Sequence, residues 1–199
     1  VACVGCCSLA PVVQAEREVW GRLDPGVVVP KLAAFLAAGS AGPERVRLVA
    51  TGTGPLRVSV GVGSCGIAAG AEEVWRAIEA HVGAVRHEVA QRPVGCEGRC
   101  YREVLVTLES PGLGVCLYGD VTPERVPELL DAHFVEGRII EDLLVERRVS
   151  SENDHRVVLR NAGLVDPASL DEYAERGGFA GLQRALHEMP SEQIVSEIE

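Results

Sequence analysis

The stretch Gly95-Cys96-Glu97-Gly98-Arg99-Cys100 has two cysteines with three residues between them, the middle one a glycine, and the chain contains this arrangement twice. The first copy is Cys3-Val4-Gly5-Cys6-Cys7. Each copy precedes a run rich in β-forming residues, an aromatic–glycine pair (Trp20-Gly21 and Tyr118-Gly119) and a helical pattern that contains a proline. Because these features recur in the same order, the sequence indicates an internal repeat.

The spacing of these cysteines suits iron–sulfur chemistry. Two thiolates separated by three residues in a loop can bind one iron, and the glycine between them lets the backbone fold beneath the metal without a Cβ clash. One such pair alone is as well explained by two half-buried loop cysteines. Two copies in the same context, with 7 Cys and a single Met in 199 residues, favour metal binding. Zinc is the weaker alternative because its sites typically use two close pairs such as C-x₂-C, and Cys3 and Cys6 form the only such pair in the sequence.

Composition limits the classes of function. The formal net charge of −10 and the pI of about 5.0 argue against a nucleic-acid or anionic membrane surface, so proteins or small molecules are the expected partners. No apolar stretch has the length of a signal peptide or membrane span, which argues against a disulfide framework. The chain starts at Val1 inside a cysteine loop and stops at Glu199 inside a helical pattern. We therefore expect a fragment of a longer polypeptide.

Residues 1–38 have the pattern of a partial module. Two short strands, over 10–14 and 18–21, are expected to form a hairpin. Asp24 then caps a helix whose first position is Pro25, and an apolar stripe follows. The stripe consists of Val28, Leu32, Phe35 and Leu36. Residues 39–55 have the composition of a linker.

Residues 56–145 have the pattern of a complete module. The first strand and the strand after the first helix should be parallel because a helix connects them. The order of elements predicts an α/β thioredoxin-like fold, in which helices pack on one mixed sheet. The expected elements are a strand over 56–60, a glycine-rich turn over 61–66, a helix over 68–82, a strand over 84–89, a hairpin of 103–108 and 115–118, and a helix over 123–134.

Residues 146–199 have a different pattern. A polar linker over 147–153 and a short strand over 156–159 precede helices over 169–176, over 179–187 and from residue 190 onward. This is too little to form an independent core, so we expect the segment to lead into a further domain.

A competing signal lies in the turn after the first strand. Gly61, Gly63 and Gly66 form G-x-G-x-x-G between a strand and a helix, and Glu88 follows at the end of the next strand, as in dinucleotide-binding folds. We favour the iron–sulfur interpretation because a cysteine loop and a hairpin come next, where a dinucleotide fold needs another crossover helix. The five His form no nucleophile motif and are expected at the surface, so no catalytic residue is predicted.

Taken together, these motifs resemble a known family. The first cysteine motif, with Ser8–Val13 and Trp20–Leu23, resembles the C-terminal part of the thioredoxin-like [2Fe-2S] ferredoxin subunit of bacterial NADH:quinone oxidoreductase (complex I). Cys65–Ala71, with Cys96 and Cys100, resembles the related ferredoxin domain at the front of the NADH-binding flavoprotein of NAD(P)-reducing hydrogenases and NAD-dependent formate dehydrogenases. The start of that flavoprotein's main domain is similar to Val158–Gly163, Tyr173–Phe179 and Met189-Pro190.

The resemblance implies a part of an NADH dehydrogenase-type oxidoreductase that passes electrons between NAD(H), FMN and iron–sulfur centres. It implies a [2Fe-2S] cofactor held by Cys65, Cys96 and Cys100 in the second module and by Cys3 and Cys7 in the first. FMN and NAD(H) are implied for the full complex only. The implied partners are other subunits of an NADH dehydrogenase, hydrogenase or formate dehydrogenase in the cytoplasm, peripheral to the inner face of the membrane.

One position departs from the family pattern. These ferredoxins use four thiolates, and the position that corresponds to the fourth one in the second module is Val60. The only other cysteine of that module is Cys116, which is expected to be a small core residue. In the first module the early pair would precede Val1, and Cys6 is expected to be a spare thiol. A ligand from elsewhere, a labile cluster, or a fold kept as an assembly surface without a cluster all remain open.

Overall fold

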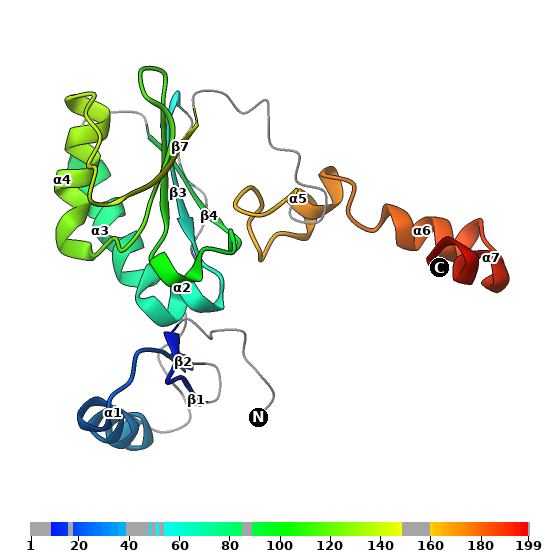
Figure 1. Ribbon diagram of the computed structural model, residues 1–199, viewed down its shortest axis with the longest axis horizontal. Coiled ribbons are helices and arrows are strands. Elements are labelled where there is room, and N and C mark those ends of the chain that lie inside the picture. Colours follow the sequence, from blue (N-terminus) through cyan, green and yellow to red (C-terminus); the bar gives the residue numbers. More distant parts are fainter. Residues whose placement is uncertain are drawn as a thin grey trace.

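The computed structural model describes residues 9–15, 18–38, 48, 51, 54–84, 89–148 and 160–198. The predictions for Cys3, Cys6, Cys7, Glu88 and the strand over 156–159 lie outside these residues. Figure 1 shows a sheet with helices against it, a small hairpin and helix α1 beneath the sheet, and helices α6 and α7 extending to one side.

The N-terminal hairpin and helix are confirmed. Strands β1 (Val13–Ala15) and β2 (Glu18–Trp20) pair antiparallel, and helix α1 spans Pro25–Ala38. Asp24 Oδ1 accepts hydrogen bonds from the backbone N of Gly26 at 2.7 Å and of Val27 at 3.1 Å, as a helix cap does. On the apolar stripe, Phe35 packs edge-on against Trp20, but Leu36 is 69% exposed.

The second module is built on one five-stranded sheet with the order β4-β3-β5-β6-β7. Its central strand β3 alternates as the sequence predicts, because Val58 and Val60 are fully buried while Arg57 is exposed. Strands β3 and β4 are parallel, and the other neighbours are antiparallel. The strands are β3 (Leu56–Gly61), β4 (Val89–Val94), β5 (Val106–Ser110), β6 (Gly114–Tyr118) and β7 (Leu144–Arg148). We call residues 54–84 and 89–148 the sheet module.

Helices complete the core of the sheet module. In helix α3 the residues Val74, Trp75 and Ile78 are buried against the sheet, and α4 lies beside α3 (Figure 1). The helical segments are α2 (Ser64–Ala69), α3 (Ala71–Ala84), the 3₁₀ turns η2 (Cys100–Arg102) and η3 (Pro123–Arg125), α4 (Val126–Leu130) and the π-helical η4 (Asp131–Val135). A βαβ unit followed by a hairpin and a helix is the thioredoxin-like arrangement predicted from the sequence.

Two details of the prediction were wrong. The single helix over 68–82 is two helices, because Gly70 adopts φ +104° and ends α2. The strand expected at 84–89 is β4 at Val89–Val94, since α3 continues to Ala84. Strand β4 tolerates Pro93 because it lies at the edge of the sheet.

The boundaries of the module are also wider than predicted. Arg147 and Arg148, expected in a polar linker, belong to the edge strand β7, whose partial burial hides the alternation that identifies inner strands. In the stretch expected as a linker, Leu48 packs on the core, and Thr51 and Gln91 exchange two backbone hydrogen bonds of 2.8 and 2.7 Å.

The internal repeat is visible in the backbone. After the first cysteine motif, Arg22 N donates to Leu9 O at 2.6 Å; after the second, Asp120 N donates to Arg102 O at 2.7 Å. Arg22 and Asp120 share φ +53°. Leu9 and Arg102 each lie two positions after the last cysteine of their copy, so the two hairpins close in the same way.

The C-terminal segment forms three short helices, α5 (Leu170–Glu175), α6 (Ala180–His187) and α7 (Ser191–Ile198). The Ser169 Oγ caps α5 by accepting from Glu172 N at 3.2 Å. Within residues 160–198, Val165 is the only buried residue, so these residues form no core of their own. Over the parts of the chain that the structure describes, every helix is too short or too polar to span a membrane.

The histidines do not all lie at the surface as predicted. His133 is 2% exposed, with Nε2 3.2 Å from Ser110 Oγ and Nδ1 3.0 Å from Tyr118 OH. Burial lowers the pKa of His133 to about 4, and Arg147 contributes to the shift. His133 is therefore a neutral, hydrogen-bonded part of the core.

Candidate metal centre

The cysteine loop joins β4 to η2 and folds back on itself. Cys96 Sγ and Cys100 Sγ are 3.5 Å apart, and Gly98 N donates a hydrogen bond of 3.2 Å to Cys96 Sγ. Gly98 has φ +83°, a conformation that side chains rarely adopt, so the central glycine of the motif is required by the backbone. The loop thus brings the two predicted thiol ligands together.

Helix α2 supplies the third predicted ligand from beside this loop. A Cβ atom on Gly63 would lie 3.0 Å from Cys96 Cβ, so the start of α2 touches the cysteine loop. Cys65 is 5% exposed and forms a small apolar cluster with Leu9, against which Cys100 packs. The three cysteines therefore come from two segments in contact.

Sequence reasoning missed Glu103. Its carboxylate and the sulfurs of Cys96 and Cys100 offer ligand atoms that all lie within 4.8 Å of one another, and this group does not include Cys65. Glu103 is 3% exposed, and its Oε2 accepts from Leu105 N at 3.0 Å. The signal available in the sequence was an acid three residues after Cys100, at a position where other residues of the strand entry are apolar.

Close packing against α2 shapes the space around Glu103. A Cβ atom on Gly66 would overlap the carbonyl oxygen of Gly61 and would lie 3.3 Å from Glu103 Oε2. Two glycines of the G-x-G-x-x-G pattern, Gly63 and Gly66, therefore allow close packing of α2 on the cysteine loop and on the end of β3.

Burial affects the protonation of Glu103 and Cys96. Burial raises the pKa of Glu103 to about 7, although the hydrogen bond from Leu105 N opposes the shift, and the nearby Glu97 raises it further. Burial also raises the pKa of the Cys96 thiol, and Cys100 adds to this. Since metals bind thiolates and carboxylates, metal binding would release protons from these residues.

Ion pairs attach the cysteine loop to strand β7. Arg99 pairs with Glu146, and Arg148 Nε donates to Glu146 Oε1 at 2.6 Å. These arginines, Arg148 first, hold the pKa of Glu146 at about 2, so its carboxylate stays charged at neutral pH. The strand that the sequence missed therefore positions the loop.

The segment after residue 159 lies on the other side of the loop. Gly95 N donates to Val165 O at 3.0 Å, and Arg92 Nη2 donates to Glu172 Oε2 at 2.7 Å. The same Glu172 oxygen accepts from Asp166 N at 3.0 Å. The start of the C-terminal segment is therefore fixed beside the candidate ligands.

Two other candidates lie apart from this site. Val60, at the expected fourth ligand position, is fully buried in the main core. Cys116 is fully buried in the same core, and burial raises the pKa of its thiol, in agreement with the prediction that it is a small core residue.

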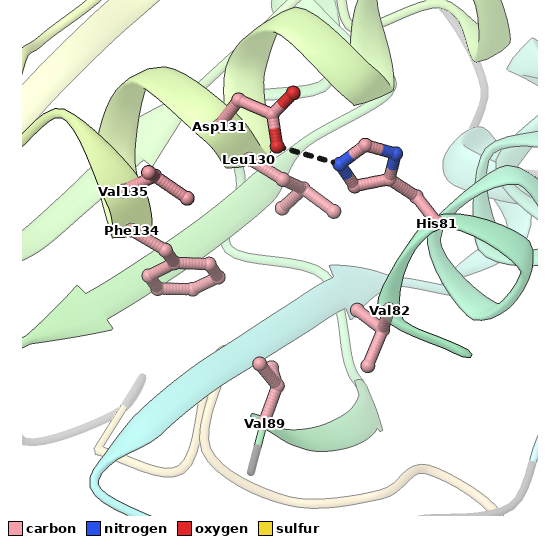
Figure 2. Close-up of a pocket in the computed structure, with 7 residues that line it drawn as sticks. All are labelled: His81, Val82, Val89, Leu130, Asp131, Phe134 and Val135. Atoms are coloured by element: carbon pink, nitrogen blue, oxygen red, sulfur yellow. Dashed lines mark hydrogen bonds and ion pairs between the residues drawn. The ribbon is translucent and has the colours of Figure 1, made fainter. Parts of the chain in front are cut away.

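A separate apolar hollow lies between the end of α3 and the helix α4–η4 (Figure 2). His81 Nε2 is 2.8 Å from Asp131 Oδ1 at its rim. Its lining is otherwise apolar, namely Val82, Val89, Leu130, Phe134 and Val135.

The donor set fits an iron–sulfur cluster. Two thiolates on one tetrahedral metal with bonds of about 2.3 Å lie about 3.8 Å apart, close to the 3.5 Å between the Cys96 and Cys100 sulfurs. In a [2Fe-2S] cluster the ligands divide between two irons, so a third thiol outside the close group is expected.

No protein-family model matches the chain. Two solved structures of a thioredoxin-like [2Fe-2S] ferredoxin from Aquifex aeolicus are similar to it. One is 23% identical, with a TM-score of 0.43, and covers 48% of this chain and 94% of its own. The other is 25% identical, with a TM-score of 0.42, and covers 48% of this chain and all of its own (100%).

Proposed function

We propose that the sheet module binds a [2Fe-2S] cluster and serves in electron transfer. The observation that carries this proposal is the pair of sulfurs, Cys96 and Cys100, 3.5 Å apart in a loop that packs against the start of helix α2, which carries Cys65. The cluster, when bound, supplies one-electron chemistry, and the protein supplies ligands, position and environment.

The residues of the site have separate tasks. Cys96, Cys100 and Cys65 would hold the irons as thiolates. Cys96 is exposed, so the site is open to the redox centre of a partner protein. Arg99, through its pair with Glu146, keeps the loop against the sheet.

The finer proposal is that the chain works within an NADH dehydrogenase-type oxidoreductase, between NAD(H) or FMN and further iron–sulfur centres. Its support is the sequence resemblance of three separate segments. Exposed apolar residues on α6 and α7, such as Leu186 (69%) and Ile198 (81%), favour contact with other subunits. In this proposal FMN and NAD(H) bind elsewhere in the complex, and Cys3 and Cys7 belong to a further cluster site.

The second candidate is a thioredoxin-like assembly module that has no cluster. The observation in its favour is the apolar surface on α1, α6 and α7, which has no use in cluster binding.

Metal analysis separates the two candidates. We expect about two irons and two sulfides per chain after anaerobic reconstitution, with loss of the cluster in Cys96→Ser and retention in the matched control Cys116→Ala. A wild-type protein that takes up neither iron nor sulfide would contradict the proposal and favour the assembly module. Zinc in place of iron would contradict it as well.

A further inference from the structure

Among the cysteines that the structure places, the proposed cluster lacks a fourth thiolate. A [2Fe-2S] cluster needs four protein ligands, and the sheet module offers Cys65, Cys96 and Cys100. Val60 cannot replace the fourth, because it lies in the main core and has no donor atom, and Cys116 lies in that core as well. A further inference about the fourth ligand rests on the proposed function above.

Glu103 lies where a fourth ligand is needed, next to the two segments that carry the three thiols. Its carboxylate lies within 4.8 Å of the sulfurs of Cys96 and Cys100, which would bind one iron, and beside helix α2, so it would share the second iron with Cys65. The first turn of α2, which carries Cys65, packs beside this carboxylate. A Cβ atom on Gly66 would lie 3.3 Å from Glu103 Oε2. Glu97, the other acid of the loop, lies outside the close group and within 3.9 Å of Arg148.

Within the described part of the chain, Glu103 has no cationic partner. A carboxylate that is 3% exposed is normally paired with a positive charge or bound to a metal. Among the residues that the structure describes, no arginine, lysine or histidine forms an ion pair with Glu103. A metal centre beside the two sulfurs would provide that charge.

The internal repeat supplies an independent comparison. Counting from the last cysteine of each copy, Glu103 corresponds to Ala10, and the flanking positions Leu9 and Arg102 make the same backbone contact. The carboxylate is therefore not a requirement of this hairpin. It occurs in the copy whose fourth thiolate position is Val60.

We propose that the Glu103 carboxylate is the fourth protein ligand of the cluster, together with Cys65, Cys96 and Cys100. Iron–sulfur centres prefer soft thiolates, so an oxygen ligand makes this the most readily exchanged position. One ligand position of the proposed site is therefore easier to open than the other three.

The test uses the full chain, reconstituted with iron-57 and sulfide, in four forms: wild type, Glu103→Gln, Glu103→Cys and the charge-matched control Glu97→Gln. Mössbauer spectroscopy reports the ligands of each iron, and release of iron to a chelator reports how firmly it is held. We expect two unequal iron sites in the wild type and in Glu97→Gln, and two sulfur-ligated sites in Glu103→Cys. Glu103→Gln should release iron at least about 10-fold faster, since even loss of a group that supports a ligand costs this much.

Each outcome decides between the two proposals. Two equivalent, fully sulfur-ligated irons in the wild type, or unchanged spectra and release rates in both Glu103 variants, would overturn the role of Glu103 and leave the cluster in place. No iron in the wild type would overturn both. Because the wild-type spectrum is itself decisive, a Glu103 variant that does not fold leaves the test intact.

Discussion

At the scale of single residues, burial in the candidate site disfavours the charged forms of Glu103 and Cys96, which are the forms that bind a metal. Glu103 shows this most clearly, because burial raises its pKa to about 7. An unfolded chain returns a glutamate to a pKa of about 4.3. The difference links protonation of Glu103 to folding of the metal-free protein.

The first prediction concerns the pH dependence of metal-free stability. Since the folded pKa of Glu103 is raised, its contribution is fully favourable below about pH 4.3 and is lost as the pH rises towards 7. Glu103→Gln mimics the neutral form, so at pH 8 it should exceed the wild type in free energy of unfolding, by up to about 3 kcal/mol. At pH 4, below the unfolded pKa, the two should be nearly equal. Urea unfolding at both pH values measures this, and a constant difference between the two proteins would contradict it.

The second prediction concerns His133, whose contribution to stability is lost at low pH and not at high pH. Its lowered folded pKa of about 4 means that folding favours the neutral ring, so its contribution is present above about pH 6.5 and is lost as the pH falls towards 4. His133→Gln, which cannot be charged, should show a shallower loss of unfolding free energy between pH 6.5 and 4.5. An equal slope for the variant and the wild type would rule out this role.

At the scale of the elements, glycines determine how the loop and the helix after β3 are built. A Cβ atom would meet no other atom within 4 Å at Gly98 or at Gly112, which lies in the β5–β6 turn. Only Gly98 has a positive φ, of +83°. The two positions form a matched pair.

The third prediction is that Gly98→Ala destabilises the metal-free protein by about 1–2 kcal/mol, the cost of a left-handed conformation for an L-residue. Gly112→Ala should change the free energy of unfolding by less than about 0.5 kcal/mol. Chemical denaturation of both variants checks this. Equal effects would mean that the loop relaxes away from the conformation described here.

The sequence was sufficient for elements with strong local signals. The Asp24-Pro25 cap, the alternation of β3 and the cysteine loop were predicted because capping, burial and spacing are local properties. Strand β7 was missed because an edge strand is only partly buried and its polar end resembles a linker. Glu103 was missed because an acid three residues after Cys100 does not by itself indicate burial. Its burial arises from the η2 turn and from the packing of α2 beside its carboxylate.

At the scale of the whole molecule, stability is unevenly distributed. The sheet module has a continuous core, whereas helices α5, α6 and α7 have no buried residue. We therefore predict that amides in α6 and α7 exchange hydrogen through local opening, with far lower protection than those in α3. Native-state hydrogen exchange measures this, and equal protection of α6 and α3 would show that α6 packs against something in solution.

Cluster binding and nucleotide binding are two functions of the whole molecule that a binding measurement separates. The glycines after β3 carry close packing, so we expect NAD⁺ and NADH to show no binding to this chain by calorimetry at millimolar concentration. A saturable heat that Gly63→Ala removes would instead support the dinucleotide interpretation.

The most direct test of the central claim is low-temperature EPR of the anaerobically reconstituted, dithionite-reduced chain. The account predicts a signal from one unpaired electron per [2Fe-2S] cluster, lost in Cys96→Ser and kept, with altered shape, in Glu103→Cys. A reduced wild-type protein that gives no EPR signal and no visible absorption would contradict it.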